Sequence, residues 1–464
     1  MSLSRKLIVI GVGVGISFSQ LESALAQTML SAEADSQEQQ QKNNSLQLPT
    51  SPNQVKIQQV RSLSLKQALE LAAQNNRDLQ IAALTLERSR SALQQAQAAL
   101  LPTFGVNGEL RQVGDQERPG DIIFEPESAS PTFLSGTVEA NYNLFTFGKR
   151  SAQINAAQEQ VKFEQLESAR IRQQTRLDVS SAYYDLQEAD EQVRINQAAV
   201  ENARIGLRDA QLREGGGTGS KLDTIRASVQ LKNAEQDLIQ AQTEQDIASD
   251  KLTRILGLSE TTDVAAAEPV QTAGQWNRSL EESIILAFQN RAELKQQSIQ
   301  RNISSQQRQI ALAEIRPTVS LFANYQALSE LSNKGADGYA AGARVAWNFL
   351  DGGTASAAAK QEDANVKIAE TRFADTRSQI RLEIEQAYKN LMANAKNIKT
   401  ATAALEQARE ALELISFGYR RGATTQLEVN TAQNELTNAA GNKVKAILNY
   451  NRSLTSLRRA INDL

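Results

Sequence analysis

The sequence contains no cysteine and no histidine, and aromatic residues make up only 5% of its 464 positions. Without cysteine there is no disulfide framework. Without histidine the chain lacks the usual general base and the commonest metal ligand of proteins. These absences exclude hydrolytic triads built on histidine and zinc sites that use it.

The chain also has little net charge and no long apolar run after its N-terminus. A formal net charge of −3 leaves no basic surface of the kind that binds nucleic acid. Beyond the N-terminal segment, no run approaches the ~18 to 20 apolar residues that a membrane-spanning helix needs. If the protein enters a membrane, it must therefore do so as a closed barrel, in which every backbone group is paired.

The N-terminus carries the features of an export signal. Arg5 and Lys6 precede an apolar run, 7–18, which is followed by a small-x-small site ending at Ala26. This order predicts a secretory signal peptide, 1–26. The alternative, a membrane anchor, is disfavoured because about 12 apolar residues cannot cross a ~30 Å hydrocarbon core as a helix.

What the chain has in abundance is internal similarity. Leu65 recurs as Leu280, a shift of 215 positions, and further residues keep that shift, namely Ala72, Gln74, Asn75, Leu79 and Pro102. From position 142, which matches position 347, the shift is 205, and Gly217 recurs as Gly422 at that spacing. Two repeats of roughly 200 residues predict two copies of one structural unit, related by pseudo-symmetry.

The repeats divide the chain into parts with different composition. A Gln/Ser/Asn-rich leader, 27–61, follows the signal peptide and is typical of a disordered segment. Repeat 1 covers 62–257, a linker with weak periodicity covers 258–277, and repeat 2 covers 278–464. Each repeat predicts the same order of elements: a helix, two strands, a very long helix, a glycine turn and a shorter helix. We expect the linker to cross the helices at mid-height, in an equatorial position.

Four segments alternate apolar and polar residues with a period of two, which predicts four strands per chain. Repeat 1 contributes 104–111 and 138–144, and repeat 2 contributes 319–325 and 343–349. Polar loops make each pair a hairpin with a long tip: 114–130 and 329–338.

Two interpretations of these hairpins are open. As ordinary amphipathic sheets, they would pack their apolar face on the helices. As membrane strands, they would turn that face to lipid and the polar face to water, with aromatics at the ends of the apolar rows: Tyr142, Phe145, Phe147, Trp347 and Phe349. Because about eight strands make the smallest usual membrane barrel, a barrel would require several chains.

Helical periodicity dominates the rest of each repeat. Apolar residues step by three and four over 150–214 and 354–418, with alanine at one of the two core positions. This pattern is typical of a closely packed coiled-coil seam. At 1.5 Å per residue each long helix would measure ~97 Å. The shorter helices of repeat 1, 77–101 and 221–257, together match that length, so each repeat predicts two columns of helix topped by a strand hairpin.

The glycine-rich segment 215–221 raises the possibility of a phosphate-binding loop. No strand precedes it, and Lys221 lacks the Gly-Lys-Ser/Thr order that such a loop requires. A turn between antiparallel helices explains the glycines better, because glycine readily adopts positive φ. With no histidine, cysteine or nucleotide loop, we expect neither an enzyme nor a bound cofactor or metal.

Signal peptide, duplication, strand hairpins and long helical hairpins together resemble the TolC-like outer-membrane efflux family. The most specific residues lie at the helical tips, where Tyr419 stands three positions before Gly422 and Glu428 stands six after it. Repeat 1 keeps part of this spacing with Gly217 and Asp223. The resemblance covers essentially 62–464.

This resemblance implies a mainly α fold with membrane β structure. Three chains, each with four strands and four helical columns, would form a 12-stranded β-barrel continuous with a long 12-helix α-barrel, a strand number within the range of membrane barrels. The function implied is a passive outer-membrane exit duct of a tripartite efflux or type I secretion system. The helical tunnel would lie in the periplasm of a diderm bacterium.

The family resemblance also implies partners. These are two further copies of the chain, a periplasmic adaptor (membrane fusion) protein, an inner-membrane ABC or RND-type transporter and outer-membrane lipid, with no nucleic acid. The alternative is a periplasmic coiled-coil adaptor or scaffold without a pore. An adaptor would place barrel-like domains around one hairpin, whereas here both repeats carry strands with one apolar face.

In the family the helical tips nearly close the tunnel, and by position this implies a gate at the tips of the present chain. Tyr419 and Asp223 would form a latch between the two hairpins, and Glu428 would form an acidic ring that favours cations. The family's tip arginine is replaced by Thr424, and Arg420 and Arg421 are candidate substitutes as latch donors. A second acidic position is occupied by Thr431, which leaves one ring.

The turns themselves are candidate docking sites. In the family such tips contact the adaptor protein. The resemblance therefore assigns adaptor docking to the two turns, through Gly217, Thr218, Gly422 and Ala423.

Overall fold

The structure is a computed structural model that describes residues 48–57, 59–112, 132–259, 261–330 and 335–463. The chain separates into two compact units, Met1–Gln59 and Val60–Leu464. Within the described part of the first unit lies one short 3-10 helix, η2 (Pro52–Gln54). The expected signal peptide and most of the expected leader lie outside the described residues.

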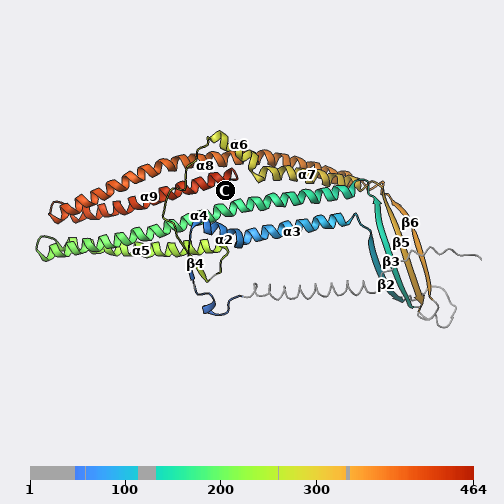
Figure 1. Ribbon diagram of the computed structural model, residues 1–464, viewed down its shortest axis with the longest axis horizontal. Coiled ribbons are helices and arrows are strands. Elements are labelled where there is room, and N and C mark those ends of the chain that lie inside the picture. The colour runs from blue at the N-terminus through green and yellow to red at the C-terminus, as the bar shows by residue number, and fades with distance from the viewer. Residues whose placement is uncertain (1–47, 58, 113–131, 260, 331–334, 464) are drawn as a thin grey trace, which may run out of the picture. The chain divides into compact units, whose positions relative to one another are not determined.

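The second unit is built mainly of helices that occur in the same order twice (Figure 1). They are α2 (Leu65–Asn75), α3 (Arg77–Ala98), α4 (Lys149–Gly215) and α5 (Lys221–Leu256), followed by α6 (Leu280–Asn290), α7 (Ala292–Ala313), α8 (Thr354–Arg420) and α9 (Gln426–Ala460). Both α4 and α8 have 67 residues. At 1.5 Å per residue each is ~100 Å long, so the two expected long helices are confirmed. Within the described residues, no helix combines the length and apolar character needed to cross a membrane.

The helix expected over 77–101 is present as α3, but the prediction of a single helix before each strand pair is wrong, because a second, shorter helix precedes it in both halves. Asn76 separates α2 from α3 with a ψ of 128°, and its side-chain oxygen accepts a hydrogen bond from the Leu79 N–H at 3.1 Å. Asparagine favours such helix starts because its side chain satisfies a free backbone donor. Arg291 makes the corresponding break between α6 and α7, with a ψ of 124°.

The shorter helices lie along the long ones. Helices α3 and α5 both pack against α4, one after the other, and α7 and α9 pack against α8 (Figure 1). Helix α4 also contacts α7 and α9, which joins the two halves. The expected seam of α4 is largely the buried one: Val179, Ala182, Leu186, Val193, Asn196, Val200, Ala203 and Ala210. Its alanines allow neighbouring backbones to approach closely.

The largest apolar clusters lie where the return helices end. Leu186 of α4 packs with Leu252 and Leu256 of α5, each at most 1% exposed. In the second half, Ile384 of α8 packs in a cluster with Leu457 of α9, and both are fully buried. Burying one such side chain stabilises the fold by roughly 1.5 to 3 kcal/mol, so these clusters anchor the middle of the unit.

Four strands form one antiparallel sheet at the end of the helices away from the tips (Figure 1). Its order is β2 (Thr103–Gln112), β3 (Thr132–Phe145), β5 (Thr318–Glu330) and β6 (Ala336–Ala346), so β3 and β5 join the two halves. The expected loop 114–130 lies outside the described residues. The expected loop 329–338 is too long, because β5 extends through its first residues and β6 through its last.

The sheet has one apolar and one polar face. Val106 pairs with Val138, Val138 with Tyr325, and Tyr325 with Tyr339, so one apolar row crosses all four strands. The next row, on the opposite face, consists of Asn107, Thr137, Gln326 and Gly338. Val106 is 79% exposed and Tyr339 is 86% exposed. The described helices of this chain therefore leave the apolar face uncovered, and the interpretation as a sheet packed on helices is wrong.

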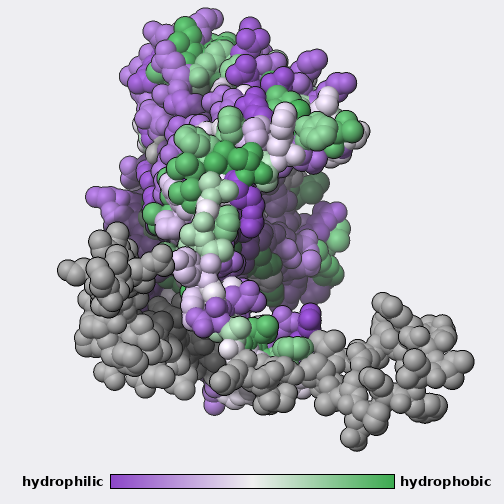
Figure 2. Space-filling view, turned by 90° about the vertical axis from the view of Figure 1, so that its right-hand side faces the viewer, coloured by the Kyte–Doolittle hydropathy of each residue, from purple (hydrophilic) through white to green (hydrophobic). Residues whose placement is uncertain are grey.

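Exposed apolar residues continue past the strand ends. The predicted strand 343–349 is too long, because β6 ends at Ala346 and Trp347 instead donates its indole N–H to the Ile315 carbonyl oxygen at 3.0 Å. Trp347 and Phe349 meet edge to face with ring centroids 5.8 Å apart. Both residues are more than half exposed, and Figure 2 shows a band of hydrophobic residues on this side of the molecule.

In each half, a polar contact joins the break between the two short helices to the end of the return helix. In the first half, the Asn76 side-chain amide donates to the Ile255 carbonyl oxygen near the end of α5, at 2.8 Å. In the second half, the Arg291 guanidinium donates to the Ala460 carbonyl oxygen at the end of α9, at 3.3 Å, and pairs with Glu383 at 3.0 Å. The two junctions occupy equivalent positions but use different chemistry.

The linker between the halves is hydrogen-bonded to a helix of each half. Its strand β4 (Thr262–Ala266) pairs with β1 (Gln59–Leu63). The α4 side chain Gln187 donates to the Glu268 carbonyl oxygen at 2.8 Å, and the α9 side chain Asn451 donates to the Gln271 carbonyl oxygen at 2.7 Å. These bonds hold the linker across α4 and α9.

Candidate gate at the helical tips

Each helical hairpin ends in a tight turn whose conformation depends on glycine. In the first turn, Gly217 has a φ of +72°, and the N–H groups of Thr218 and Gly219 both donate to the Arg213 carbonyl oxygen at 2.9 Å. In the second turn, Gly422 has a φ of +79°, and the Ala423 N–H donates to the Gly418 carbonyl oxygen at 2.8 Å. The expected turns at both glycines are confirmed, since positive φ favours glycine.

Each turn has a second glycine. In the first turn it is Gly219, which follows Gly217, and in the second turn it is Gly418, which precedes Gly422. In the first turn, a side chain at Gly219 would bring its Cβ within 3.0 Å of the Arg213 backbone. In the second turn, the equivalent of Gly219 is Thr424, and the equivalent of Arg213 is Gly418, whose added Cβ would lie 2.9 Å from the Thr424 methyl group. One member of each facing pair is thus glycine, which leaves room for arginine in one turn and threonine in the other.

Tyr419 lies at the contact between the two hairpins and is only 5% exposed. The guanidinium of Arg213, from the other hairpin, covers its ring at 4.6 Å from the ring centroid. Arg213 Nη1 also donates to the Tyr419 carbonyl oxygen, and Nη2 donates to the Thr218 carbonyl oxygen at 3.2 Å. One arginine therefore contacts both turns.

The Tyr419 hydroxyl takes no part in this contact. It is buried and has no hydrogen-bond partner among the described residues. Burial raises the pKa of Tyr419 above its ordinary value, because the phenolate would lose its solvation. The hydroxyl is therefore neutral at physiological pH, and the ring face is the part of Tyr419 that binds its neighbour.

The two acidic side chains expected at the gate hold the starts of their own helices. The Asp223 carboxylate accepts from the Ser220 hydroxyl at 2.8 Å, and the Glu428 carboxylate accepts from the Thr425 N–H at 2.6 Å and the Thr425 hydroxyl at 2.9 Å. The backbone hydrogen bond from Thr425 lowers the pKa of Glu428. Both are capping boxes. Among the described residues no hydrogen bond joins Tyr419 to Asp223, and the latch between them stays a prediction.

The remaining predicted gate residues lie at the surface. Arg421 stacks on Phe417 of its own helix, with its guanidinium carbon 4.1 Å from the ring centroid, and Arg420 is exposed. The Thr424 hydroxyl donates to the Ile415 carbonyl oxygen at 2.8 Å, so this side chain turns back to α8.

The residues expected to dock an adaptor are exposed at the outermost positions of the two turns: Gly217, Thr218, Gly422 and Ala423. Exposed apolar side chains flank each turn at equivalent places. Leu212 and Leu222 are 67% and 52% exposed around the first turn, and Phe417 and Leu427 are 48% and 60% exposed around the second. Each tip thus presents exposed turn backbone and two exposed apolar side chains.

Two further contacts join the hairpins behind the tips. The Gln433 amide of α9 donates to the Asn202 carbonyl oxygen of α4 at 3.2 Å. The Gln230 amide of α5 donates to the Asn434 side-chain oxygen of α9 at 2.7 Å. Both contacts are made by side-chain amides, so this part of the contact between the hairpins is polar.

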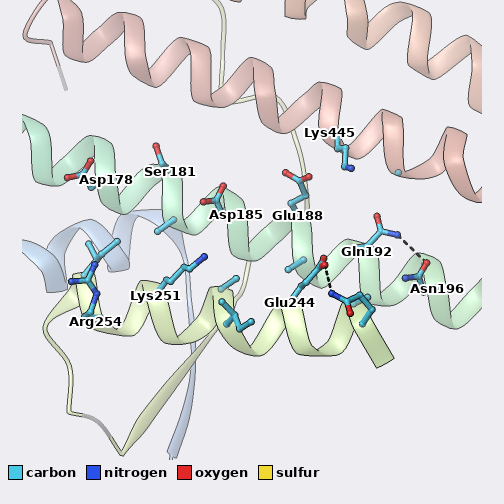
Figure 3. Close-up of a pocket in the computed structure, with 18 of the residues that line it drawn as sticks. Asp178, Ser181, Asp185, Glu188, Gln192, Asn196, Glu244, Lys251, Arg254 and Lys445 are labelled. Carbon is cyan, nitrogen blue, oxygen red and sulfur yellow. Dashed lines mark hydrogen bonds between the residues drawn. The ribbon is translucent and has the colours of Figure 1, made fainter. Parts of the chain in front are cut away.

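A charged groove of about 1340 Å³ lies farther from the tips, between α4, α5 and α9. Figure 3 shows Asp185 and Glu188 of α4 opposite Lys445 of α9, with Lys251 contributed by α5. Arg452 of α9 binds Asp185 at 2.6 Å and Glu188 at 2.8 Å. No group of side chains arranged to hold a metal ion occurs within the described residues.

Sequence reasoning missed Arg213 as a site residue. Its position before the first turn matches Gly418 before the second, so the duplication itself pointed to a difference at this place. The capping boxes were also visible as Ser220-x-x-Asp223 and Thr425-x-x-Glu428, a pattern that predicts helix starts.

These features define a class of proteins in which long antiparallel helical hairpins extend from a sheet with one uncovered apolar face. The chain belongs to the outer membrane efflux protein family, whose sequence profile matches residues 68–258 and 284–463. The family resemblance inferred from the tips is thereby confirmed.

The chain is similar to several proteins of related description. It is 29% identical over 195 residues to the cobalt-zinc-cadmium resistance protein CzcC of Cupriavidus metallidurans, covering 42% of each chain. It is 24% identical over 388 residues to the pyoverdine export outer membrane protein OpmQ of Pseudomonas aeruginosa, covering 80% of this chain and 79% of OpmQ. The match to CzcC thus spans less than half of that protein's length.

Solved structures share the fold. The outer membrane protein VceC of Vibrio cholerae superposes with a TM-score of 0.72 at 20% identity, over 86% of this chain and 96% of VceC. The CmeC outer membrane channel of Campylobacter jejuni gives a TM-score of 0.75 at 16% identity, over 86% of this chain and 85% of CmeC. At these identities the likeness establishes the mainly helical architecture.

Proposed function

We propose that the protein is a passive exit duct in the outer membrane, through which an inner-membrane pump delivers its substrate to the exterior. The observation that carries this proposal is the sheet, whose uncovered apolar face suits lipid and whose opposite face is polar. Helices ~100 Å long extend from it and suit a tunnel across the periplasm. The expected signal peptide fits export to that compartment.

The active assembly is a homotrimer in this proposal. Strands β2 and β6 are the two edges of the four-stranded sheet. Free strand edges invite pairing with another chain, and pairing β6 of one copy with β2 of the next would close a ring. Three copies would give a 12-stranded barrel, within the range known for membrane barrels.

Toward the tips, the two outer helices of the bundle, α5 and α8, each have an open side that carries exposed apolar residues. Helix α5 packs on α4, α4 on α9, and α9 on α8, which leaves one side of α5 and of α8 open. Near the tips, Ile225 is exposed on α5 and Leu414 is exposed on α8, at similar distances along the chain from their own turns. Such apolar surfaces, left open in one chain, suit contact with another copy.

Farther from the tips, the open sides carry opposite charges at similar heights. Asp246 and Asp250 are exposed on α5, and Lys389 and Lys396 are exposed on α8. None of the four forms an ion pair within the described part of the chain. Complementary charges of this kind fix the register between packed surfaces, so they support a joint between α5 of one copy and α8 of the next.

The tips would serve as the gate and as the docking site for an adaptor protein. Family membership and the exposed turns support docking at Gly217, Thr218, Gly422 and Ala423, with an ABC or RND-type pump beneath. Glu428, three times repeated in a trimer, would form an acidic ring that favours cations. The class of substrate would be set by the pump.

Outer-membrane fractions and planar lipid bilayers test this function. We expect heat-resistant trimers in the outer-membrane fraction and single-channel conductance from the purified protein. The adaptor alternative predicts a periplasmic protein that forms no channel. Recovery of the exported chain only as a soluble periplasmic monomer would overturn the duct.

A further inference from the structure

We propose that Arg213 is the residue that holds the two tips of one chain together and keeps the gate narrow, acting on the ring of Tyr419 and not on its hydroxyl. This inference rests on the proposed duct. It differs from the latch implied by the family resemblance, in which Tyr419 would pair with Asp223.

The geometry of Arg213 suits a clamp between two turns. Its guanidinium lies 4.6 Å from the Tyr419 ring centroid and donates to the Tyr419 carbonyl oxygen in the second hairpin. The same group donates to the Thr218 carbonyl oxygen in the first turn at 3.2 Å. An arginine side chain stays charged and offers several donors in one plane, so a single residue can bind a ring face and two carbonyl oxygens together.

Partial burial strengthens this contact. Tyr419 is 5% exposed, and the Arg213 Nε atom is buried without a hydrogen-bond partner among the described residues. The attraction between a cation and a ring grows when water is excluded. The Tyr419 hydroxyl, also buried without a partner, adds nothing to it.

The groups that would form the alternative latch are engaged elsewhere. Asp223 accepts from the Ser220 hydroxyl at 2.8 Å and caps α5. Thr424, which replaces the family's tip arginine, donates to the Ile415 carbonyl oxygen at 2.8 Å. Arg213 is therefore the cation in the described structure that spans the two turns.

The contact has a defined direction within the duplicated chain. Arg213 stands where the second half has Gly418, and Tyr419 stands where the first half has Glu214. The equivalent positions in the opposite halves hold Gly418 and Glu214, which cannot form this contact, so the clamp forms once per chain. Three copies would carry three clamps, each inside its own chain.

Single-channel conductance of purified trimers in planar bilayers separates the two latches. We expect Arg213→Ala and Tyr419→Ala to raise conductance several-fold, because either change frees the tips. Tyr419→Phe should behave as the wild type, since the ring remains and the hydroxyl has no partner. Arg213→Lys, which keeps the charge but loses the planar group, should lie between wild type and Arg213→Ala.

Arg204→Ala is the matched control. Arg204 lies on the same helix and pairs with Glu201 at 2.9 Å, on its own helix. Its loss should leave conductance unchanged. Heat-resistant trimers should be recovered for every variant, and if Arg213→Ala does not assemble, Tyr419→Ala and Arg213→Lys decide the question in its place.

Three results would overturn the clamp. Wild-type conductance in both Arg213→Ala and Tyr419→Ala trimers would remove the contact from the gate. An increase in Tyr419→Phe as large as that in Tyr419→Ala would return the latch to the hydroxyl, as would an increase in Asp223→Asn without one in Arg213→Ala. Absence of conductance in the wild type together with every variant would instead contradict the proposed duct itself.

Discussion

Single residues decide how each half closes on itself, and Gly257 is the clearest case. It follows α5 with a φ of +67°, and an added Cβ would lie 2.3 Å from the Asn75 carbonyl oxygen. We expect Gly257→Ala to lower the free energy of unfolding by more than about 2 kcal/mol, since a left-handed conformation alone costs an L-residue about 1 to 2 kcal/mol. Chemical denaturation followed by helical circular dichroism measures the loss.

Gly217→Ala is the control for that change. Gly217 has a similar φ of +72°, but nothing lies within 4 Å of an added Cβ. Its replacement should therefore cost only the conformational part, about 1 to 2 kcal/mol. Equal losses at both positions would contradict the proposed clash with Asn75.

Glu428 should give the start of α9 a dependence on pH. The hydrogen bonds from Thr425 lower its pKa from an ordinary value of 4.5, so its stabilising contribution is present above pH 4.5 and is lost as the pH falls through the lowered value. We expect Glu428→Gln to speed amide hydrogen exchange in the first turn of α9 at neutral pH. Once the pH falls below that lowered pKa, the wild type and the variant should become alike, because both side chains are then uncharged.

Glu435→Gln serves as the reference for that experiment. Glu435 is exposed on α9, away from its first turn. Its replacement should leave exchange at the helix start unchanged at both pH values. A difference between wild type and Glu428→Gln that persists at low pH would show that the carboxylate charge is not its cause.

The candidate site was predictable from sequence at the residues that shape the turns, but not at the residue that joins them. Gly217 and Gly422 stand out because glycine turns between helices leave a local pattern. Arg213 and Tyr419 are 206 positions apart, and their contact depends on how two hairpins pack side by side. No local pattern encodes such a distance. Spacing alone likewise assigned Asp223 to a latch, although the serine three positions earlier marks it as a capping residue.

At the scale of elements, the junctions at Asn76 and Arg291 show how equivalent helix ends can be held with different strength. Arg291 pairs with Glu293 at 2.9 Å and Glu383 at 3.0 Å, and its side chain is 5% exposed. Arg459 also lies 3.4 Å from Glu293 and 3.7 Å from Glu383, so removing Arg291 leaves one cation for two carboxylates. We expect Arg291→Ala to lower the free energy of unfolding by about 3 kcal/mol or more.

Two other substitutions should lower the free energy of unfolding by less. Asn76→Ala removes neutral hydrogen bonds and should cost about 1 to 3 kcal/mol. Arg301→Ala breaks an exposed pair with Glu370, in which both side chains are 52% exposed, and should cost less than about 1 kcal/mol. The same denaturation measurement ranks all three. A loss at Arg291 no larger than that at Arg301 would contradict a buried network.

Elements with strong periodicity were the most predictable part of the fold. The seam of α4 follows from residues such as Leu186 and Val193, which repeat every three or four positions. The helix expected over 77–101 begins where α3 begins, but the short helix α2 before it was missed. Trp347 was assigned to a strand because it keeps the alternation, yet its indole N–H binds a carbonyl oxygen outside the sheet.

At the scale of the whole molecule, the matching charges on α5 and α8 predict how copies meet. We expect Lys396→Glu to place like charges at the proposed joint and to lower the temperature at which trimers dissociate, as observed by unheated and heated gel electrophoresis. Adding Asp246→Lys should restore at least part of that loss, because the pair regains opposite signs.

Each single charge reversal supplies the comparison for the pair. Asp246→Lys alone should weaken the trimer as Lys396→Glu does. If the double variant is weaker than both single variants, the two positions do not face each other. Raising the salt concentration should reduce every one of these effects, since exposed charges are screened over about 10 Å at 0.1 M ionic strength.

Gly219 in the first turn and Gly418 in the second also constrain how the sequences of the two tips can change. Gly219 cannot accept threonine while the Arg213 backbone lies against it, and Gly418 cannot accept arginine while Thr424 occupies the facing space. A single substitution that makes one tip more like the other therefore meets a steric penalty before any advantage arises. Such epistasis would preserve the difference between the tips even if selection on either one were relaxed.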